Sequence, residues 1–97
     1  MQFITHNQDD LLDINGTHLL DTVELPYAAI EKCFGKPLTG DFDKVQAEWV
    51  IQFEDGLIGT IYDWKEYGRP YWDVDDWHIG GKDQEVAFRI KQILLGE

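Results

Sequence analysis

The sequence predicts a small α+β domain in which two helices pack against an antiparallel sheet. An Asp-Gly pair between two alternating apolar runs is the strongest local signal for a β-hairpin. Two amphipathic segments with the apolar spacing of helices flank this hairpin in the sequence. A length of 97 residues is enough for one hydrophobic core. We therefore expect one domain over residues 1–97, with a central hairpin at about 46–65, a strand at about 75–80, and helices at about 22–34 and 83–95.

Two weaker strand signals precede the first predicted helix. Phe3–Thr5 has the composition of a short strand. An Asn-Gly pair within Leu12–Leu19 favours a hairpin turn, with a loop as the alternative.

Residues 22–34 are predicted to form the first helix. Asp21 and Glu24 have capping-box spacing, although Thr22 is an alternative N-cap. Pro26 is tolerated only in the first turn and favours a regular helix that begins there. The apolar positions that share one helix face are Leu25, Ala29, Ile30, Cys33 and Phe34. Gly and Pro soon afterwards predict the end of the helix and a polar loop at 38–44.

The central hairpin determines which side chains face the core. With Asp55-Gly56 as a two-residue turn, Trp49 lies opposite Tyr62. The face expected in the core carries Ala47, Trp49, Ile51, Phe53, Ile58, Thr60, Tyr62 and Trp64. The other face carries Glu48, Val50, Gln52, Gly59, Ile61 and Asp63. There Glu48 would oppose Asp63, a repulsion that a slipped register or a basic partner would relieve.

The C-terminal part is predicted to contain a loop, a strand and a helix. Asp76–Gly80 has the pattern of a third strand, and Asp83 is placed to cap a helix that runs to about Leu95. The buried stripe of this helix is expected to be Val86, Ile90, Ile93 and Leu94. Glu85 and Arg89 have the i,i+4 spacing of a surface ion pair.

The chain is strongly acidic, and this limits its partners. It has 8 Lys and Arg against 19 Asp and Glu, a formal net charge of −11, and residues 1–31 contain no Lys or Arg. Such a charge repels nucleic acid and anionic membranes and attracts basic protein surfaces. The alternative is that acidity only keeps a small protein soluble, as a monomer or small homo-oligomer. No apolar run is long enough to span a membrane and no signal peptide is visible, so we expect a cytoplasmic protein.

The sequence contains no catalytic or metal-binding motif. The three histidines lie far apart, and none has a neighbouring nucleophile pattern. The acidic run at residues 73–76 lacks the Gly and the distal Glu of a calcium loop. We therefore expect no metal, no cofactor and no enzymatic activity. A hydrolase using Asp63 or His78 is the enzymatic alternative, without support from spacing.

The loop before the third strand is the strongest candidate binding surface, because it combines aromatic, acidic and arginine side chains. Trp, Tyr and Arg dominate interface hot spots, and loops on a rigid scaffold commonly carry function. The candidate partner-binding residues are Glu66, Tyr67, Arg69, Tyr71, Trp72, Asp73, Asp75 and Asp76. If extended, Asp73 and Asp75 would have the spacing of side chains on one strand face and could imitate phosphates. The structural alternative is that this loop folds back over the open face of the sheet.

A second candidate site lies between the third strand and the last helix. Backbone N–H groups at a glycine-rich helix start favour an anion. The candidate ligand-binding residues are Arg69, Gly80, Gly81 and Lys82. Asp83 already occupies the N-cap, and a tight turn from strand to helix is the alternative.

Four motifs occur in order within residues 25–95. They are Phe-Gly-x-Pro from Phe34, Trp-x-Ile-x-Phe-x-Asp-Gly from Trp49, Ile-Tyr-Asp-Trp-Lys from Ile61, and Trp-x-Ile-Gly-Gly from Trp77. With these motifs the chain resembles small uncharacterised proteins of bacteriophages and prophages. Residues 57–59 depart from the more usual Thr-Val-Ala of those proteins. The resemblance supplies no catalytic residues. It implies a viral accessory protein in a bacterial cytoplasm, and many such proteins bind and block a host defence protein.

Two functions follow as hypotheses. The first is a non-enzymatic inhibitor of anti-CRISPR or nuclease-inhibitor type, which docks an acidic and aromatic surface on the basic site of a host protein without binding nucleic acid itself. The alternative is a sponge for a small nucleotide signal. The net charge opposes that anion, so a local basic pocket would be required.

Overall fold

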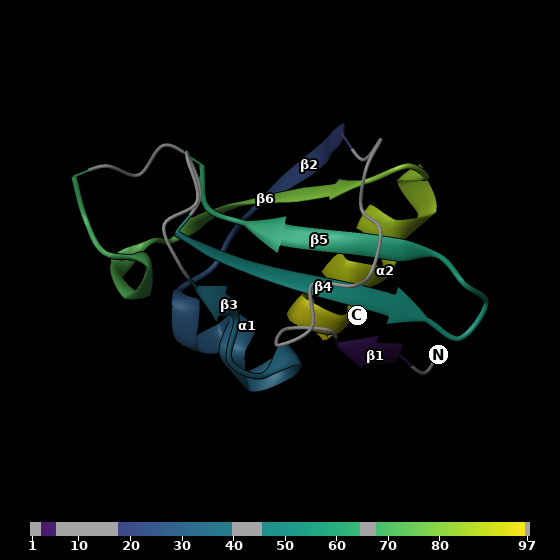
Figure 1. Cartoon of the computed structure of the whole chain (residues 1–97), viewed down its shortest axis with the longest axis horizontal. Coiled ribbons are helices and arrows are strands. Elements are labelled where there is room, and N and C mark those ends of the chain that lie inside the picture. Colours follow the sequence, from purple (N-terminus) through teal and green to yellow (C-terminus); the bar gives the residue numbers. More distant parts are fainter. Residues whose placement is uncertain (1–2, 6–17, 40–45, 65–67, 97) are drawn as a thin grey trace.

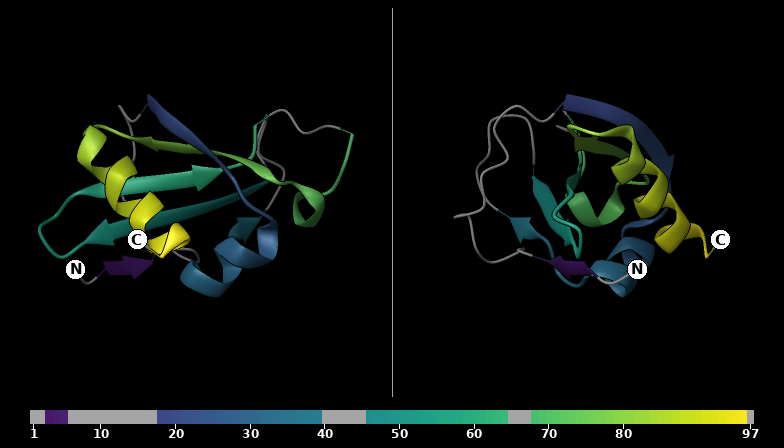
Figure 2. Two further views of the ribbon diagram at one scale, coloured as in Figure 1. Left: turned by 180° about the vertical axis from the view of Figure 1, so that it is seen from behind. Right: turned by 90° about the vertical axis from the view of Figure 1, so that its right-hand side faces the viewer.

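The computed structural model describes residues 3–5, 18–39, 46–64 and 68–96, which form a sheet covered on one side by two helices (Figures 1 and 2). The elements are β1 (Phe3–Thr5), β2 (His18–Glu24), α1 (Tyr27–Phe34), β3 (Leu38–Thr39), β4 (Ala47–Phe53), β5 (Ile58–Tyr62), the 3-10 helix η1 (Tyr71–Asp73), β6 (Asp76–Gly81) and α2 (Gln84–Leu95). The antiparallel sheet has the order β1-β4-β5-β6-β2, and β3 also pairs with β4. The predicted α+β fold is confirmed, as are the short strand at Phe3–Thr5, the hairpin, the third strand and the last helix.

The predicted helix at 22–34 is wrong in its first five residues. Residues 18–24 instead form the edge strand β2, in which Val23 pairs with Trp77 and Glu24 with Asp76 of β6. Pro26 ends this strand and directly precedes α1 as its N-cap. The pairing of β2 with a strand more than 50 residues away overrides the local helix signals. The predicted hairpin at 12–19 lies outside the described residues apart from its last two, which belong to β2.

The register of the central hairpin differs from the prediction by one residue. The turn contains three residues, Glu54–Gly56. The Phe53 N–H donates to the Leu57 carbonyl at 2.8 Å, and the Gly56 N–H donates to the Phe53 carbonyl at 2.9 Å. Gly56 has φ +93°, the left-handed conformation that ends this turn type. As a result Trp49 pairs with Ile61, and Glu48 with Tyr62.

A shift of one residue moves every side chain of one strand to the opposite face. The predicted core face of β4 is confirmed, since Ala47, Trp49, Ile51 and Phe53 are all buried. The predicted core face of β5 is wrong. Gly59 and Ile61 face the helices, and the side chains on the face opposite the helices are Ile58, Thr60, Tyr62 and Trp64. The expected repulsion between Glu48 and Asp63 therefore does not arise.

Two buried tryptophans hold α1 at both of its ends. The Trp77 indole N–H donates to the carbonyl of Leu25, just before the helix, at 3.1 Å. The Trp49 indole N–H donates to the carbonyl of Gly35, just after the helix, at 2.7 Å. The two rings also meet edge to face with centroids 5.2 Å apart. A helix of only eight residues is marginal alone, so these tertiary contacts fix its position.

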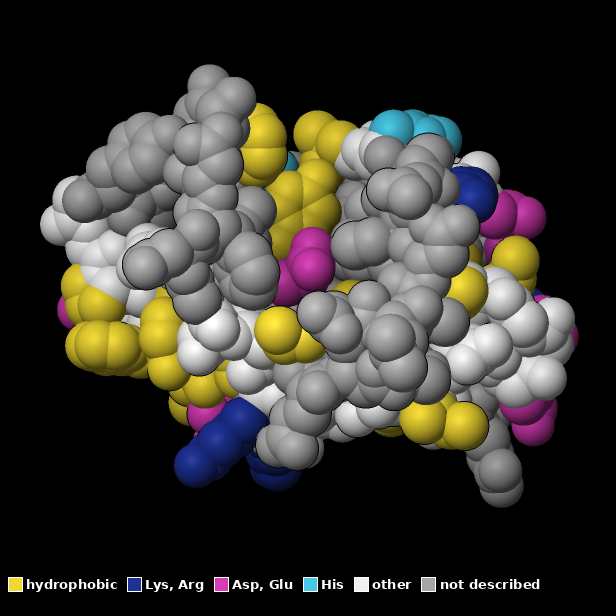
Figure 3. Space-filling view, viewed as in Figure 1, with side chains coloured by type: hydrophobic (Ala, Val, Ile, Leu, Met, Phe, Trp, Pro, Cys, Tyr) yellow, Lys and Arg dark blue, Asp and Glu magenta, His cyan; other side chains and the backbone are white. Residues whose placement is uncertain are grey.

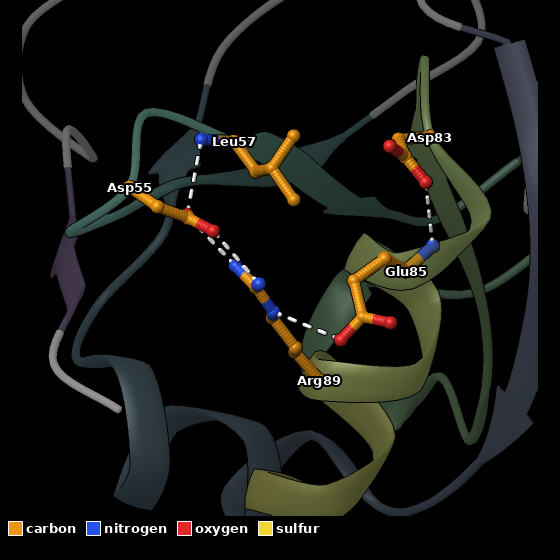
Figure 4. A network of polar contacts seen from close by, with 5 residues as sticks. All are labelled: Asp55, Leu57, Asp83, Glu85 and Arg89. Carbon is orange, nitrogen blue, oxygen red and sulfur yellow. Dashed lines mark hydrogen bonds and ion pairs between the residues drawn. The ribbon is translucent and has the colours of Figure 1, made fainter.

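The second helix is tied to the hairpin turn by Arg89 (Figure 4). The predicted pair with Glu85 is confirmed at 3.1 Å, and the guanidinium also donates to both carboxylate oxygens of Asp55 at 2.8 Å. The central carbon of the Arg89 guanidinium lies 5.2 Å from the centre of the Phe53 ring. Hydrogen bonding from Arg89 lowers the pKa of Asp55. The predicted cap is also confirmed, because Asp83 accepts from the Glu85 N–H at 3.0 Å.

Candidate functional site

The sheet face opposite the helices presents one row of polar and aromatic side chains across four strands. Glu48 of β4 pairs with Tyr62 of β5, Tyr62 with His78 of β6, and His78 with Thr22 of β2. Directly opposed side chains on one sheet face lie within contact distance. We call Glu48, Tyr62, Trp64 and His78 the open-face row.

Three rings of the open-face row contact one another. The centroids of Tyr62 and His78 are 5.5 Å apart, and those of Tyr62 and Trp64 are 6.2 Å apart, both in edge-to-face geometry. The rings of Trp64 and His78 lie within 23° of parallel at 6.3 Å. Trp64 is 40% exposed. The sequence predicted Tyr62 and Trp64 as core packing, and the shifted register places them here instead.

Glu48 is the only acid of the row and is partly buried. Among the described residues, no ion pair or hydrogen bond to its carboxylate is found, and desolvation raises its pKa. Burial, and secondly the charge of Glu48, raise the pKa of Tyr62 as well. Figure 3 looks onto this face and shows acidic atoms near its centre, with hydrophobic side chains directly above them. The row thus combines aromatic surface with a carboxylate that has no counter-charge among the described residues.

The raised pKa of Glu48 predicts a pH-dependent gain in stability for Glu48→Gln. Folding disfavours the ionised form of the Glu48 carboxylate and favours the protonated form. The stabilisation by the protonated form is therefore fully present below the pKa of Glu48 in the unfolded chain, and it is lost as the pH rises through the pKa of Glu48 in the folded protein. We expect the variant to melt at a higher temperature than the wild type near about pH 7, and at the same temperature below about pH 4. The titratable neighbours facing Glu48 in the row are Tyr62 and His78.

Melting curves at the two pH values test this expectation. Glu54→Gln, at the exposed hairpin turn, is the matched control and should leave the melting temperature unchanged at both. A lower melting temperature for Glu48→Gln near neutral pH would show that the carboxylate is stabilising.

The predicted partner-binding loop is described from residue 68 onward, and Glu66 and Tyr67 lie outside the described residues. Arg69 donates to the Asp73 carbonyl and forms an ion pair with Asp75, both at 3.4 Å. The Tyr71 ring packs edge to face on Tyr27 of α1 at 5.2 Å, which fixes η1 against the helix layer. This part of the loop therefore packs on α1.

The loop exposes one large aromatic side chain between acids. Trp72 is 60% exposed, and Asp73, Asp75 and Asp76 are exposed as well. The prediction that Asp73 and Asp75 have the spacing of phosphates is wrong. Asp73 ends η1, and the two residues do not share an extended strand. We call residues 69–76 the acidic loop. It adjoins the open-face row, since Asp76 precedes His78 by two positions on the same strand face.

The acidic loop also faces an acid on the edge strand. Glu24 of β2 is paired directly with Asp76 of β6, and both side chains are exposed. Like charges in opposed positions destabilise a strand pair by up to about 1 kcal/mol. A basic partner at this end of the sheet would relieve that repulsion.

The structure does not bring the four candidate ligand-binding residues together. Arg69 pairs with Asp75 before the start of β6, and Lys82 follows its end, which corresponds to a separation of roughly 20 Å along the strand. Gly80 and Gly81 are buried in the sheet. A Cβ on Gly80 would lie 2.8 Å from the Thr60 hydroxyl, so packing explains this glycine. Arg69, Gly80, Gly81 and Lys82 therefore do not form one pocket for a nucleotide.

The two candidate catalytic residues, Asp63 and His78, make contacts that belong to the fold. Asp63 is 0% exposed, and its Oδ1 accepts from the backbone N–H groups of Gln46 and Ala47. His78 lies among the rings of the open-face row. Within the described part of the chain, no group of three or more His, Cys, Asp or Glu side chains could hold a metal ion. No helix in that part is long and apolar enough to cross a membrane.

Comparison of the chain with protein-family models, curated proteins and solved structures finds no match. The resemblance to bacteriophage proteins therefore stays a prediction.

Proposed function

We propose that this protein is a non-enzymatic, phage-type accessory protein that binds a host protein. The acidic loop would dock on the basic surface with which a host defence or nuclease-type protein holds nucleic acid, and so block that surface. The supporting observation is Trp72, which is 60% exposed among three exposed aspartates, while the neighbouring Tyr71 is anchored on α1. An exposed aromatic on a fixed scaffold is typical of an interface hot spot.

The charge of the chain supports the same proposal. A net charge of −11 speeds encounter with a basic surface, and the acids around Trp72 orient the complex. Desolvation of the tryptophan then slows dissociation. Binding would also bring a positive charge to the repulsive Glu24–Asp76 pair.

Affinity capture with matched variants tests the proposal. The bait variant Asp73→Asn/Asp76→Asn removes two charges from the acidic loop. The control Glu54→Gln/Glu85→Gln removes two exposed charges from the hairpin turn and the start of α2, so both baits have the same net charge. Neither bait variant alters Asp75, which pairs with Arg69.

We expect wild type and control to recover one basic nucleic-acid-handling protein from nuclease-treated host lysate. Recovery should fall about tenfold with the loop variant, and should fall in high salt. Equal recovery by both variants, or no partner in low salt, would overturn the proposal.

A further inference from the structure

We propose that the open-face row is a binding site for a guanidinium group, supplied by an arginine side chain of a partner protein. The site lies on the sheet face, and arginine binding there does not depend on whether the acidic loop binds a host protein. Its carboxylate is Glu48, and its aromatic surface comes from Tyr62, Trp64 and His78.

The Glu48 carboxylate favours a cationic ligand. Glu48 is partly buried, and no cationic partner to it is found among the described residues. A partly desolvated carboxylate without a counter-charge is costly, and a cation that enters the row recovers that cost. The strong acidity of the whole chain favours the same class of ligand.

The rings favour a planar cation over a compact one. Trp64 and His78 are within 23° of parallel, and Tyr62 meets both rings in edge-to-face geometry. A guanidinium stacks on aromatic faces, donates to a carboxylate in bidentate geometry, and is more weakly hydrated than an ammonium group. Arginine is therefore better suited to this row than lysine.

The protein contains the same chemistry elsewhere. Arg89 places its guanidinium 5.2 Å from the centre of the Phe53 ring and binds both oxygens of Asp55 at 2.8 Å. That site joins a carboxylate, an aromatic face and an arginine. Figure 4 shows its arginine and carboxylate, which link the helix to the hairpin turn. The open-face row repeats the carboxylate and the aromatic surface on the other side of the sheet.

NMR titration of the full chain with N-acetyl-arginine amide tests the site. The indole N–H signals of Trp64 and Trp72 report the open-face row and the acidic loop separately. We expect the Trp64 signal to shift with a dissociation constant on the order of millimolar, and the Trp72 signal to stay in place. Glu48→Gln should weaken binding about tenfold while the protein stays folded, and Trp64→Leu should weaken it as well.

The controls separate this inference from the proposed function. Trp72→Leu, which changes the acidic loop alone, should leave arginine binding unchanged. N-acetyl-citrulline amide, a neutral analogue of the same shape, should not bind, and N-acetyl-lysine amide should bind more weakly. A Trp72 shift instead of a Trp64 shift, equal binding of citrulline or lysine, or unchanged affinity in Glu48→Gln would each overturn the assignment.

Discussion

Replacing Asp63 by alanine is expected to lower the free energy of unfolding by about 3 kcal/mol. The Asp63 Oδ1 accepts from the N–H of Gln46 at 2.7 Å and from the N–H of Ala47 at 3.0 Å. The side chain is 0% exposed, so water cannot replace these bonds without rearrangement. Each buried N–H left without an acceptor costs about 1–3 kcal/mol. For a domain of this size, we expect the melting temperature to fall by about 10 °C or more.

Asp63→Asn is the matched control for this loss. The asparagine carbonyl oxygen can accept from the same two N–H groups. Its amide nitrogen would replace Oδ2, which is buried and has no hydrogen-bond partner within the described part of the chain. Because the variant keeps an acceptor for both N–H groups, we expect less than half of the loss seen with alanine. Urea denaturation of both variants measures the difference, and an alanine variant as stable as the wild type would contradict the role given to Asp63.

A second large effect is expected where α2 crosses Gly59. A Cβ at this position would lie 2.1 Å from Cγ1 of Val86 and 2.9 Å from Cδ1 of Ile90. Both side chains are buried and packed, so Gly59→Ala forces the helix to move and should cost about 1–3 kcal/mol. Gly68→Ala, with no atom of the described residues within 4 Å of the added Cβ, should leave stability unchanged.

A double-mutant cycle tests this contact directly. Val86→Ala removes the methyl group that blocks the new Cβ, so the two substitutions together should cost less than the sum of their separate losses. We expect a coupling of about 1 kcal/mol or more from denaturation curves. Additive losses would mean that α2 does not rest on Gly59.

The elements that the sequence predicted well are those defined by local signals. The buried face of β4 follows from its alternation, and α2 follows from its apolar stripe and the Asp83 cap. The register of β5 could not be fixed in this way, because an Asp-Gly pair fits both a two-residue and a three-residue turn. The strand at 18–24 was missed because its partner β6 is distant in the sequence.

The candidate site was predictable only in part, for the same reasons. The acidic loop could be found from residue types, since aspartates surround Trp72 within a few positions. The open-face row could not, because the assumed register buried Tyr62 and Trp64. With the observed three-residue turn, Glu48 faces Tyr62, and the row follows from strand pairing alone.

The central claim is that the acidic loop occupies the nucleic-acid-binding surface of a host protein. The most direct measurement is competition, in which the anisotropy of a labelled oligonucleotide bound to the captured partner is followed as this protein is added. We predict that wild type and Glu54→Gln/Glu85→Gln displace the oligonucleotide, and that Asp73→Asn/Asp76→Asn requires about tenfold higher concentration. An oligonucleotide that stays bound while this protein also binds would contradict the claim.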